Sequence, residues 1–217
     1  MENNFNKFSF ITADDHSVVT QSLSFILKDL YKDPIVFKIE NISDIIKVLN
    51  DNTVHLLLLD VAFPDGNSLG IIPTLKKMQP ELKILIFSGY DEEIYAIRYI
   101  NAGANGFLSK ISSEEEIKNA ITAVMNSGKY LSKYIQEKIM DSYILKKPTN
   151  PLEQLSNREL EVAKLMVDGY GNAEICQALN IQKTTVSTYK TRIFEKTGVD
   201  NLSYLIQLFN LYWKEDR

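Results

Sequence analysis

The chain has 217 residues, of which 45% are hydrophobic and 24% are charged, and its formal net charge is −4. This composition is ordinary for one or two globular domains, and the small acidic excess gives no general reason to expect binding to nucleic acid or to an acidic membrane. Cys176 is the only cysteine, which excludes an intrachain disulfide and a cluster of thiolate ligands around a metal. No apolar run is long enough to span a bilayer and polar residues interrupt the N-terminal segment, so we expect a cytoplasmic protein without signal peptide or membrane segment.

Short apolar segments alternate with amphipathic ones over about the first 128 residues. The apolar segments predict strands at residues 8–12, 35–39, 56–60, 83–88 and 106–110. The amphipathic segments predict helices at residues 19–31, 43–49, 69–77, 91–102 and 113–128. This alternation predicts an α/β domain with a doubly wound, five-stranded parallel sheet and right-handed crossovers.

The remainder of the chain is predicted to be helical. Residues 130–145 carry apolar side chains near helical spacing and predict a linker helix, and the proline-containing segment 146–151 predicts a hinge. We therefore expect a first domain at residues 1–128, a linker at 129–151, and a small all-α domain at 152–217.

The predicted strands end on polar side chains. Asp14 and Asp15 follow the first strand, Asp60 ends the third, Ser88 the fourth and Lys110 the fifth. Because the carboxyl ends of parallel strands meet along one edge of a sheet, we expect these side chains to converge. Three carboxylates repel one another there unless a cation neutralises them, and Mg²⁺ suits that role. A carboxylate beside Mg²⁺ can attack phosphorus and form an aspartyl phosphate, with a lysine and a hydroxyl stabilising the phosphoryl oxygens.

Each of these side chains alone could be a helix or turn cap, or a solvated surface group. Their joint occurrence at converging strand ends favours a phosphoryl-binding pocket. His16 and His55 have no cluster of partner ligands in the sequence, so we assign neither a catalytic nor a metal-binding role.

In these residues the chain resembles the receiver domain of two-component response regulators, over about residues 6–128. The stretch Gly-Ala-Asn-Gly-Phe-Leu-Ser-Lys, which leads into Lys110, belongs to the match. The resemblance implies a flavodoxin-like receiver fold with Asp60 as the phosphoacceptor, stabilised by Lys110, and with two side chains that rearrange on phosphorylation, Ser88 and Phe107. It also implies a set of Mg²⁺ ligands: Asp15, Asp60, the backbone carbonyl of Ala62 and, through water, Asp14.

The chain departs from the usual receiver pattern at three positions. Phe107 stands where a tyrosine is frequent, so no phenolic hydroxyl is available there, and Ile111 stands where many receivers have a proline. Ser68 stands where a glycine is usual, and Gly66 could take over the tight turn. None of these changes touches the acceptor, so we expect the domain to remain competent for phosphorylation.

The sequence of residues 152–217 predicts a helix-turn-helix. Ser156 and Glu159 have capping-box spacing, Gly169-Tyr170-Gly171 predicts a turn before a helix at 173–179, and a last helix at 184–197 ends at Gly198. One side of that last helix is apolar, and the other carries short polar side chains flanked by basic ones. The candidate DNA-binding residues are Lys183, Thr184, Ser187, Thr188, Lys190, Thr191, Arg192 and Lys196. The basic side chains would contact phosphates, and the hydroxyls and methyls would contact the edges of the nucleobases in the major groove.

A solvated amphipathic surface helix is the simpler alternative, because residues 152–217 contain eight Lys or Arg and nine Asp or Glu, a net charge of −1. The motif favours DNA binding. Residues 152–209 resemble the LuxR-type helix-turn-helix that ends NarL/FixJ-type response regulators. The matching residues are Ser156, Arg158, Glu159, Asn172, Glu174, Ile175, Leu179, Ile181, Thr185, Val186, Ile193, Lys196, Gly198 and Val199. An apolar stripe follows, of which part belongs to the core and the rest is a candidate dimer contact: Leu202, Leu205, Phe209 and Trp213.

We therefore expect a DNA-binding transcriptional response regulator that uses Mg²⁺ and is not an enzyme. A partner sensor histidine kinase would phosphorylate Asp60, and a homodimer would bind double-stranded promoter DNA. Two alternatives remain open. One is a phosphoryl-transfer enzyme with an aspartate nucleophile, although such enzymes commonly need a second acid where this chain has Ala62. The other is a regulator that ignores phosphorylation and uses its first domain only for dimerisation.

Overall fold

The structure is a computed structural model that describes residues 7–145 and 150–213. The chain divides into two compact units, and the boundary falls between Lys138 and Ile139, within the predicted linker. The predicted hinge at 146–151 lies largely outside the described residues, as do the outermost residues of the two predicted domains.

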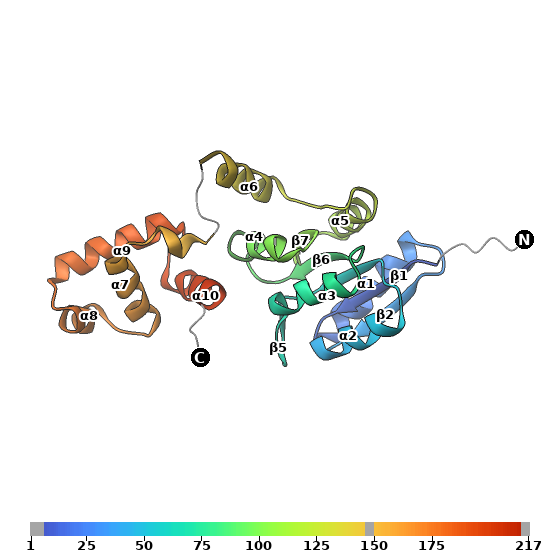
Figure 1. Cartoon of the computed structure of the whole chain (residues 1–217), viewed down its shortest axis with the longest axis horizontal. Helices are drawn as coiled ribbons and strands as arrows, with labels where there is room; N and C mark the ends of the chain where they lie inside the picture. The colour runs from blue at the N-terminus through green and yellow to red at the C-terminus, as the bar shows by residue number, and fades with distance from the viewer. Residues whose placement is uncertain (1–6, 146–149, 214–217) are drawn as a thin grey trace, which may run out of the picture. The chain divides into compact units, whose positions relative to one another are not determined.

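The first unit is built around a five-stranded sheet (Figure 1). Its strands are β1 (Ser9–Ala13), β2 (Ile35–Ile39), β3 (Leu56–Leu59), β6 (Lys83–Ser88) and β7 (Gly106–Ser109). They pair in the order β2-β1-β3-β6-β7, and every pairing is parallel. The predicted fold class is thus confirmed.

Strand β3 lies at the centre of the sheet, and all four of its leucines are buried. A run of leucines without alternation fits a strand that is covered on both faces. The register pairs Leu59 with Ala13 of β1 and with Ile86 of β6. The residues that follow these three strands therefore leave the sheet along one edge.

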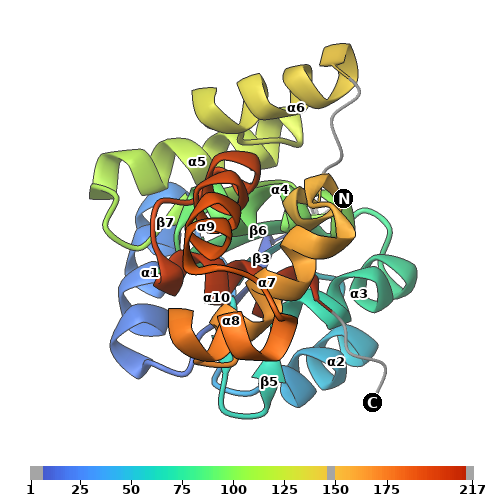
Figure 2. The ribbon, with the colours of Figure 1, turned by 90° about the vertical axis from the view of Figure 1, so that its left-hand side faces the viewer.

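Helices cover both faces of the sheet (Figure 2). Helices α1 (Ser17–Leu30) and α5 (Glu114–Ser127) pack on one face, where Leu27 and Val124 share a core cluster with Leu58. The other face is covered by α2 (Ile42–Asp51), α3 (Ile72–Met78) and α4 (Glu92–Ala102). This two-sided cover leaves the carboxyl edge of the sheet as the place where polar side chains can gather.

A feature that the sequence did not predict separates β3 from α3. Strands β4 (Ala62–Phe63) and β5 (Gly66–Asn67) form a two-residue antiparallel hairpin, and a 3₁₀ turn, η1 (Ser68–Ile71), follows it. Strands of two residues are too short to show a period in the sequence, so only the turn was predicted. Gly66 has φ +137, which supports the expectation that it adopts the backbone conformation of the tight turn.

The rest of the described chain is helical. Helix α6 (Lys133–Leu145) follows the sheet and contains the boundary between the two units, and the 3₁₀ turn η2 (Pro151–Gln154) comes next along the described chain. The second unit then contains α7 (Asn157–Val167), α8 (Asn172–Leu179), α9 (Lys183–Thr197) and α10 (Leu202–Tyr212). The capping box of Ser156 and Glu159 begins α7, and Gly198 ends α9 with a left-handed backbone, both as predicted. Within the described residues, none of the helices combines the length and apolarity that crossing a bilayer requires.

Candidate functional site

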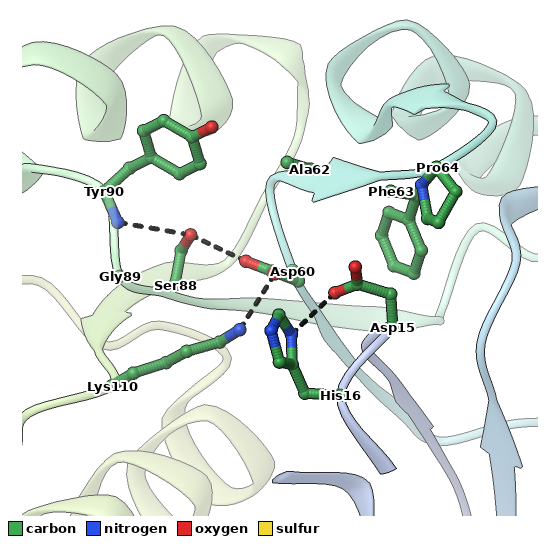
Figure 3. A pocket seen from close by; sticks show the side chains of 10 residues that line it. All are labelled: Asp15, His16, Asp60, Ala62, Phe63, Pro64, Ser88, Gly89, Tyr90 and Lys110. Carbon is green, nitrogen blue, oxygen red and sulfur yellow. Dashed lines mark hydrogen bonds and ion pairs between the residues drawn. The ribbon is translucent and has the colours of Figure 1, made fainter.

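A pocket of about 470 Å³ opens at the carboxyl edge of the sheet (Figure 3). It collects residues that lie far apart in the sequence. Its lining comes from the ends of four strands and from the β4–β5 hairpin: Asp15, His16, Asp60, Ala62, Phe63, Pro64, Ser88, Gly89, Tyr90 and Lys110. The predicted convergence of these strand ends is therefore found in the structure.

Asp60 lies at the centre of this pocket with a side chain that is almost fully buried. Its Oδ1 accepts hydrogen bonds from the Val61 N–H and from the Ser88 hydroxyl, both at 2.7 Å. Its Oδ2 accepts a hydrogen bond from Lys110 Nζ at 2.8 Å. The groups that hold the carboxylate are thus donors of the kind that can also hold oxygens of an attached phosphoryl group.

Lys110 joins two carboxylates. Its ammonium lies 2.6 Å from Asp14 Oδ2 and 2.8 Å from Asp60 Oδ2. Burial alone would lower the pKa of Lys110, but hydrogen bonds and ion pairs to Asp14 and Asp60 outweigh burial and raise that pKa above its ordinary value. The lysine therefore stays charged at neutral pH, and it balances part of the negative charge of the acidic side chains.

His16 is a member of the site that the sequence analysis left without a role. Its Nδ1 lies 2.7 Å from Asp15 Oδ1 and 3.2 Å from Asp14 Oδ1, while its side chain is 71% exposed. The ring thus covers the two carboxylates at the rim of the pocket. The only signal in the sequence is its position directly after the acidic pair.

The oxygen donors of the pocket suit a hard divalent cation. Asp15, Asp60 and Ala62 line the same pocket, and the buried Asp14 offers a carboxylate oxygen within 4.8 Å of one from Asp15. Mg²⁺ prefers a small number of carboxylate and carbonyl oxygens and fills its remaining positions with water or phosphate oxygens. The residues present therefore fit Mg²⁺ at this edge of the sheet.

The two residues expected to rearrange on phosphorylation are both fully buried. Ser88 is hydrogen-bonded to Asp60, as described above. Phe107 lies in β7 and its ring meets that of Tyr99 of α4 edge-on, with the ring centroids 6.4 Å apart. A change at Asp60 can thus reach Ser88 directly, whereas Phe107 lies against helix α4.

Helix α9 presents the polar face that the sequence predicted. Val186 and Ile193 are fully buried in the core of the second unit. The eight candidate DNA-binding residues are exposed or half-buried. The hydroxyls of Ser187, Thr188 and Thr191 donate to the carbonyl four residues earlier, so their outward groups are hydroxyl oxygens and, in the threonines, methyls.

Lys196 differs from the other candidates on α9. Its Nζ lies 2.6 Å from Oε2 of Glu159, a carboxylate that is only 3% exposed. The same carboxylate oxygen accepts hydrogen bonds from the N–H and the hydroxyl of Ser156. Lys196 therefore stabilises the fold of the second unit, and this ion pair competes with any contact to a phosphate. Lys190 has a looser partner, the side-chain oxygen of Asn172 at 3.2 Å.

The apolar stripe of α10 is divided between core and surface. Leu205 and Phe209 are buried in the core of the second unit and so are not available for a dimer contact in this conformation. Leu202 is 41% exposed, and the half-buried Trp213 contacts the Phe209 ring and has the ammonium of Lys164 4.0 Å from its own ring centroid. Of the four candidate dimer residues, only Leu202 and Trp213 keep exposed surface that a second copy could contact.

Comparison with known proteins agrees with both parts of this description. Residues 10–122 match the response regulator receiver domain family, and residues 153–209 match the LuxR family of bacterial regulatory proteins. The chain is 30% identical to the Fimbriae Z protein of Escherichia coli K12, over 94% of this chain and 97% of that protein. It is also 30% identical to the oxygen regulatory protein NreC of Staphylococcus aureus JH9, over 91% of this chain and 94% of that protein.

Solved structures with the same fold include RcsB. A structure of two RcsB dimers bound to two parallel DNAs aligns with a TM-score of 0.79 and 23% identity, over 95% of this chain and 100% of that one. RcsB from Salmonella enterica serovar Typhimurium, bound to a promoter in the presence of a phosphomimetic, aligns with a TM-score of 0.76 and 22% identity, over 95% and 99%. This chain belongs to the NarL/FixJ-type two-component response regulators, transcription regulators in which a receiver domain is joined to a LuxR-type DNA-binding domain.

Proposed function

We propose that Asp60 accepts a phosphoryl group from a sensor histidine kinase, and that its phosphorylation controls the binding of a homodimer to promoter DNA. The observation that carries the proposal is the environment of Asp60: a buried carboxylate, held by Ser88 and Lys110, that lines an open acidic pocket. A buried nucleophile surrounded by donors is arranged for attack on an electrophile that enters the pocket.

In this proposal an Asp60 carboxylate oxygen forms a new bond to phosphorus. The bond between phosphorus and the histidine nitrogen of the kinase breaks, and its electron pair returns to the imidazole ring. Lys110 and Ser88 can then donate hydrogen bonds to the negatively charged phosphoryl oxygens, because they already donate to the two oxygens of the acceptor. Asp15, Asp60 and the carbonyl of Ala62 would hold Mg²⁺, with Asp14 acting through water. When bound, Mg²⁺ neutralises the carboxylates and the phosphoryl oxygens.

Acetyl phosphate should phosphorylate the full chain at Asp60. On a Phos-tag gel, the wild type incubated with acetyl phosphate and Mg²⁺ should give a retarded band that disappears when EDTA replaces Mg²⁺. Asp60→Asn should give no retarded band, because the amide is not a nucleophile. The matched control is Asp51→Asn, an exposed carboxylate at the end of α2, which should behave as the wild type. A retarded band that persists in Asp60→Asn would place the acceptor elsewhere.

The DNA-binding part of the proposal rests on helix α9. Its exposed face offers cations for phosphates and small polar groups for base edges. Residues 152–217 together have a net charge of −1, so affinity for one half-site should be low, and two copies would add their contacts. RcsB, which shares the fold, has been solved as dimers on DNA.

Replacing Lys183 or Arg192 by alanine should weaken DNA binding about equally for all sequences. Both side chains are exposed on α9, and removing one cation from a phosphate should reduce the slope of log K against log salt by about 1. Thr188→Val should instead change the sequence preference, because it removes an outward oxygen and leaves the charge unchanged. Fluorescence anisotropy at several salt concentrations measures both effects, with exposed Lys32→Ala of the receiver as the control. An unchanged salt slope in Lys183→Ala and Arg192→Ala would exclude these residues from the interface.

A further inference from the structure

Ser68 occupies the position where receivers usually carry glycine, and the structure gives its side chain specific partners. The residue is fully buried at the start of η1. Its Oγ lies 2.6 Å from the main-chain oxygen of Asp60 and 3.1 Å from that of Val61. The same oxygen lies 3.3 Å from the hydroxyl of Tyr99, a fully buried residue of α4. A side chain that the usual glycine lacks thus joins the acceptor residue to a helix.

The direction of these hydrogen bonds follows from the number of protons. A main-chain carbonyl only accepts, so the single proton of the Ser68 hydroxyl points to the carbonyls of Asp60 and Val61. The Tyr99 hydroxyl is then the donor to Ser68 Oγ. The result is a chain of two hydroxyls that runs from Tyr99 through Ser68 to the carbonyl of Asp60, in which each bond polarises the next.

Both ends of this chain of hydroxyls meet parts of the receiver that the proposed function expects to respond to phosphorylation. At one end, the main chain of Asp60 and Val61 sets the position of the acceptor, since the Val61 N–H donates to Asp60 Oδ1, and it leads directly to Ala62. At the other end, the Tyr99 ring lies against Phe107, which has no hydroxyl of its own. A shift of the acceptor's main chain therefore has a direct polar connection to helix α4.

We propose that Ser68 and Tyr99 are positioning residues that couple phosphorylation of Asp60 to helix α4. Ser68 holds the main chain that carries the acceptor. When phosphorylation displaces that main chain, Tyr99 transmits the displacement to helix α4. In this receiver the two hydroxyls provide a polar connection that the Phe107 side chain cannot provide. The inference depends on the proposed function, because it needs Asp60 to be the acceptor.

The test measures how α4 responds to phosphorylation in the full chain. Hydrogen exchange of peptides covering Glu92–Ala102 is followed with and without acetyl phosphate and Mg²⁺, and a Phos-tag gel of the same samples reports phosphorylation. Tyr99→Phe and Ser68→Ala each remove one hydroxyl oxygen and little else. Tyr95→Phe is the matched control, because Tyr95 is a buried tyrosine of the same helix that lies outside this chain of hydroxyls.

In the wild type, phosphorylation should change the exchange rates of α4. In Tyr99→Phe and in Ser68→Ala the change should be about fivefold smaller, the factor that one hydrogen bond of ordinary strength represents, although both variants still give the retarded band. The double variant should behave like either single one, because both changes interrupt the same chain of hydroxyls.

Three outcomes would overturn the inference. The first is a wild-type response of α4 in both variants, and the second is a loss in Tyr95→Phe as large as in Tyr99→Phe. Both leave the phosphorylation of Asp60 intact and so spare the proposed function. The third is a wild type without a retarded band, which overturns the proposed function and the inference together.

Discussion

Replacing Glu159 by alanine should lower the free energy of unfolding of the second, helical unit by about 2–5 kcal/mol. The change removes the capping box of α7, which is worth about 0.5–2 kcal/mol, and charge-assisted hydrogen bonds that contribute about 1.5–3 kcal/mol. Such a loss is a large part of the stability of a small domain, about 5–15 kcal/mol. Helices α7 and α9 are joined by the contact between Glu159 and Lys196, so α9 should lose order with α7.

Urea unfolding measured by tryptophan fluorescence tests this expectation. Trp213 is the only tryptophan of the chain, and its ring contacts Phe209 in the core of the helical unit, so its emission reports on this unit rather than on the receiver. The control is Glu161→Ala, since Glu161 is an exposed residue of the same helix whose ion pair with Arg158 lies at the surface. Equal unfolding midpoints for the two variants would contradict the special role of Glu159.

The same carboxylate should make the helical unit sensitive to acid. Burial raises the pKa of Glu159, but the hydrogen bonds from Lys196 and Ser156 outweigh burial and hold that pKa below its ordinary value of 4.5. A group with a depressed pKa in the folded state stabilises the fold fully above its unfolded pKa, and this stabilisation is lost as the pH falls through the folded pKa. The urea concentration at the unfolding midpoint of the wild type should therefore decrease as the pH is lowered below about 4.5. For Glu159→Gln this midpoint should depend less on pH over the same range.

The sequence predicted those parts of the fold that local pattern determines. The strands at residues 35–39 and 83–88 have the predicted bounds, because each is an apolar run between polar segments. The pocket was predictable because a parallel sheet brings its strand ends together, whatever the details of the helices. Polar residues at the strand ends must therefore lie close together at that edge of the sheet.

Other features depend on contacts between distant residues and left no local signal. The ion pair of Lys196 with Glu159 joins residues 37 positions apart, so α9 alone suggested that this lysine was free for DNA. Leu205 and Phe209 share an apolar stripe with Leu202, and only packing against the other helices decides which of them are buried. In the sequence, Ser68 showed only that the usual glycine was absent. Its hydroxyl contacts a tyrosine 31 positions away, and no local pattern indicates that contact.

Acetyl phosphate should raise the affinity of the wild type for its operator by about 5- to 150-fold, the usual range for coupling between two sites, and should leave Asp60→Ala unchanged. The reason lies in the charge of the helical unit. Helix α9 carries four of the eight positive residues of segment 152–217, whose net charge is −1, so a single copy should bind weakly and the two-copy complex should depend on what the receiver does.

The measurement is fluorescence anisotropy on a fragment enriched from genomic DNA, at one fixed salt concentration because the affinity itself depends on salt. Mg²⁺ is present throughout, and Asp51→Asn again serves as the matched control. If the donor also raises the affinity of Asp60→Ala, the effect does not pass through the acceptor. If neither protein responds although the wild type is phosphorylated, the receiver serves association alone, and the pocket around Asp60 is chemically intact but not coupled to α9. A response confined to the wild type and the control would show that the acidic pocket and helix α9 form one regulatory system.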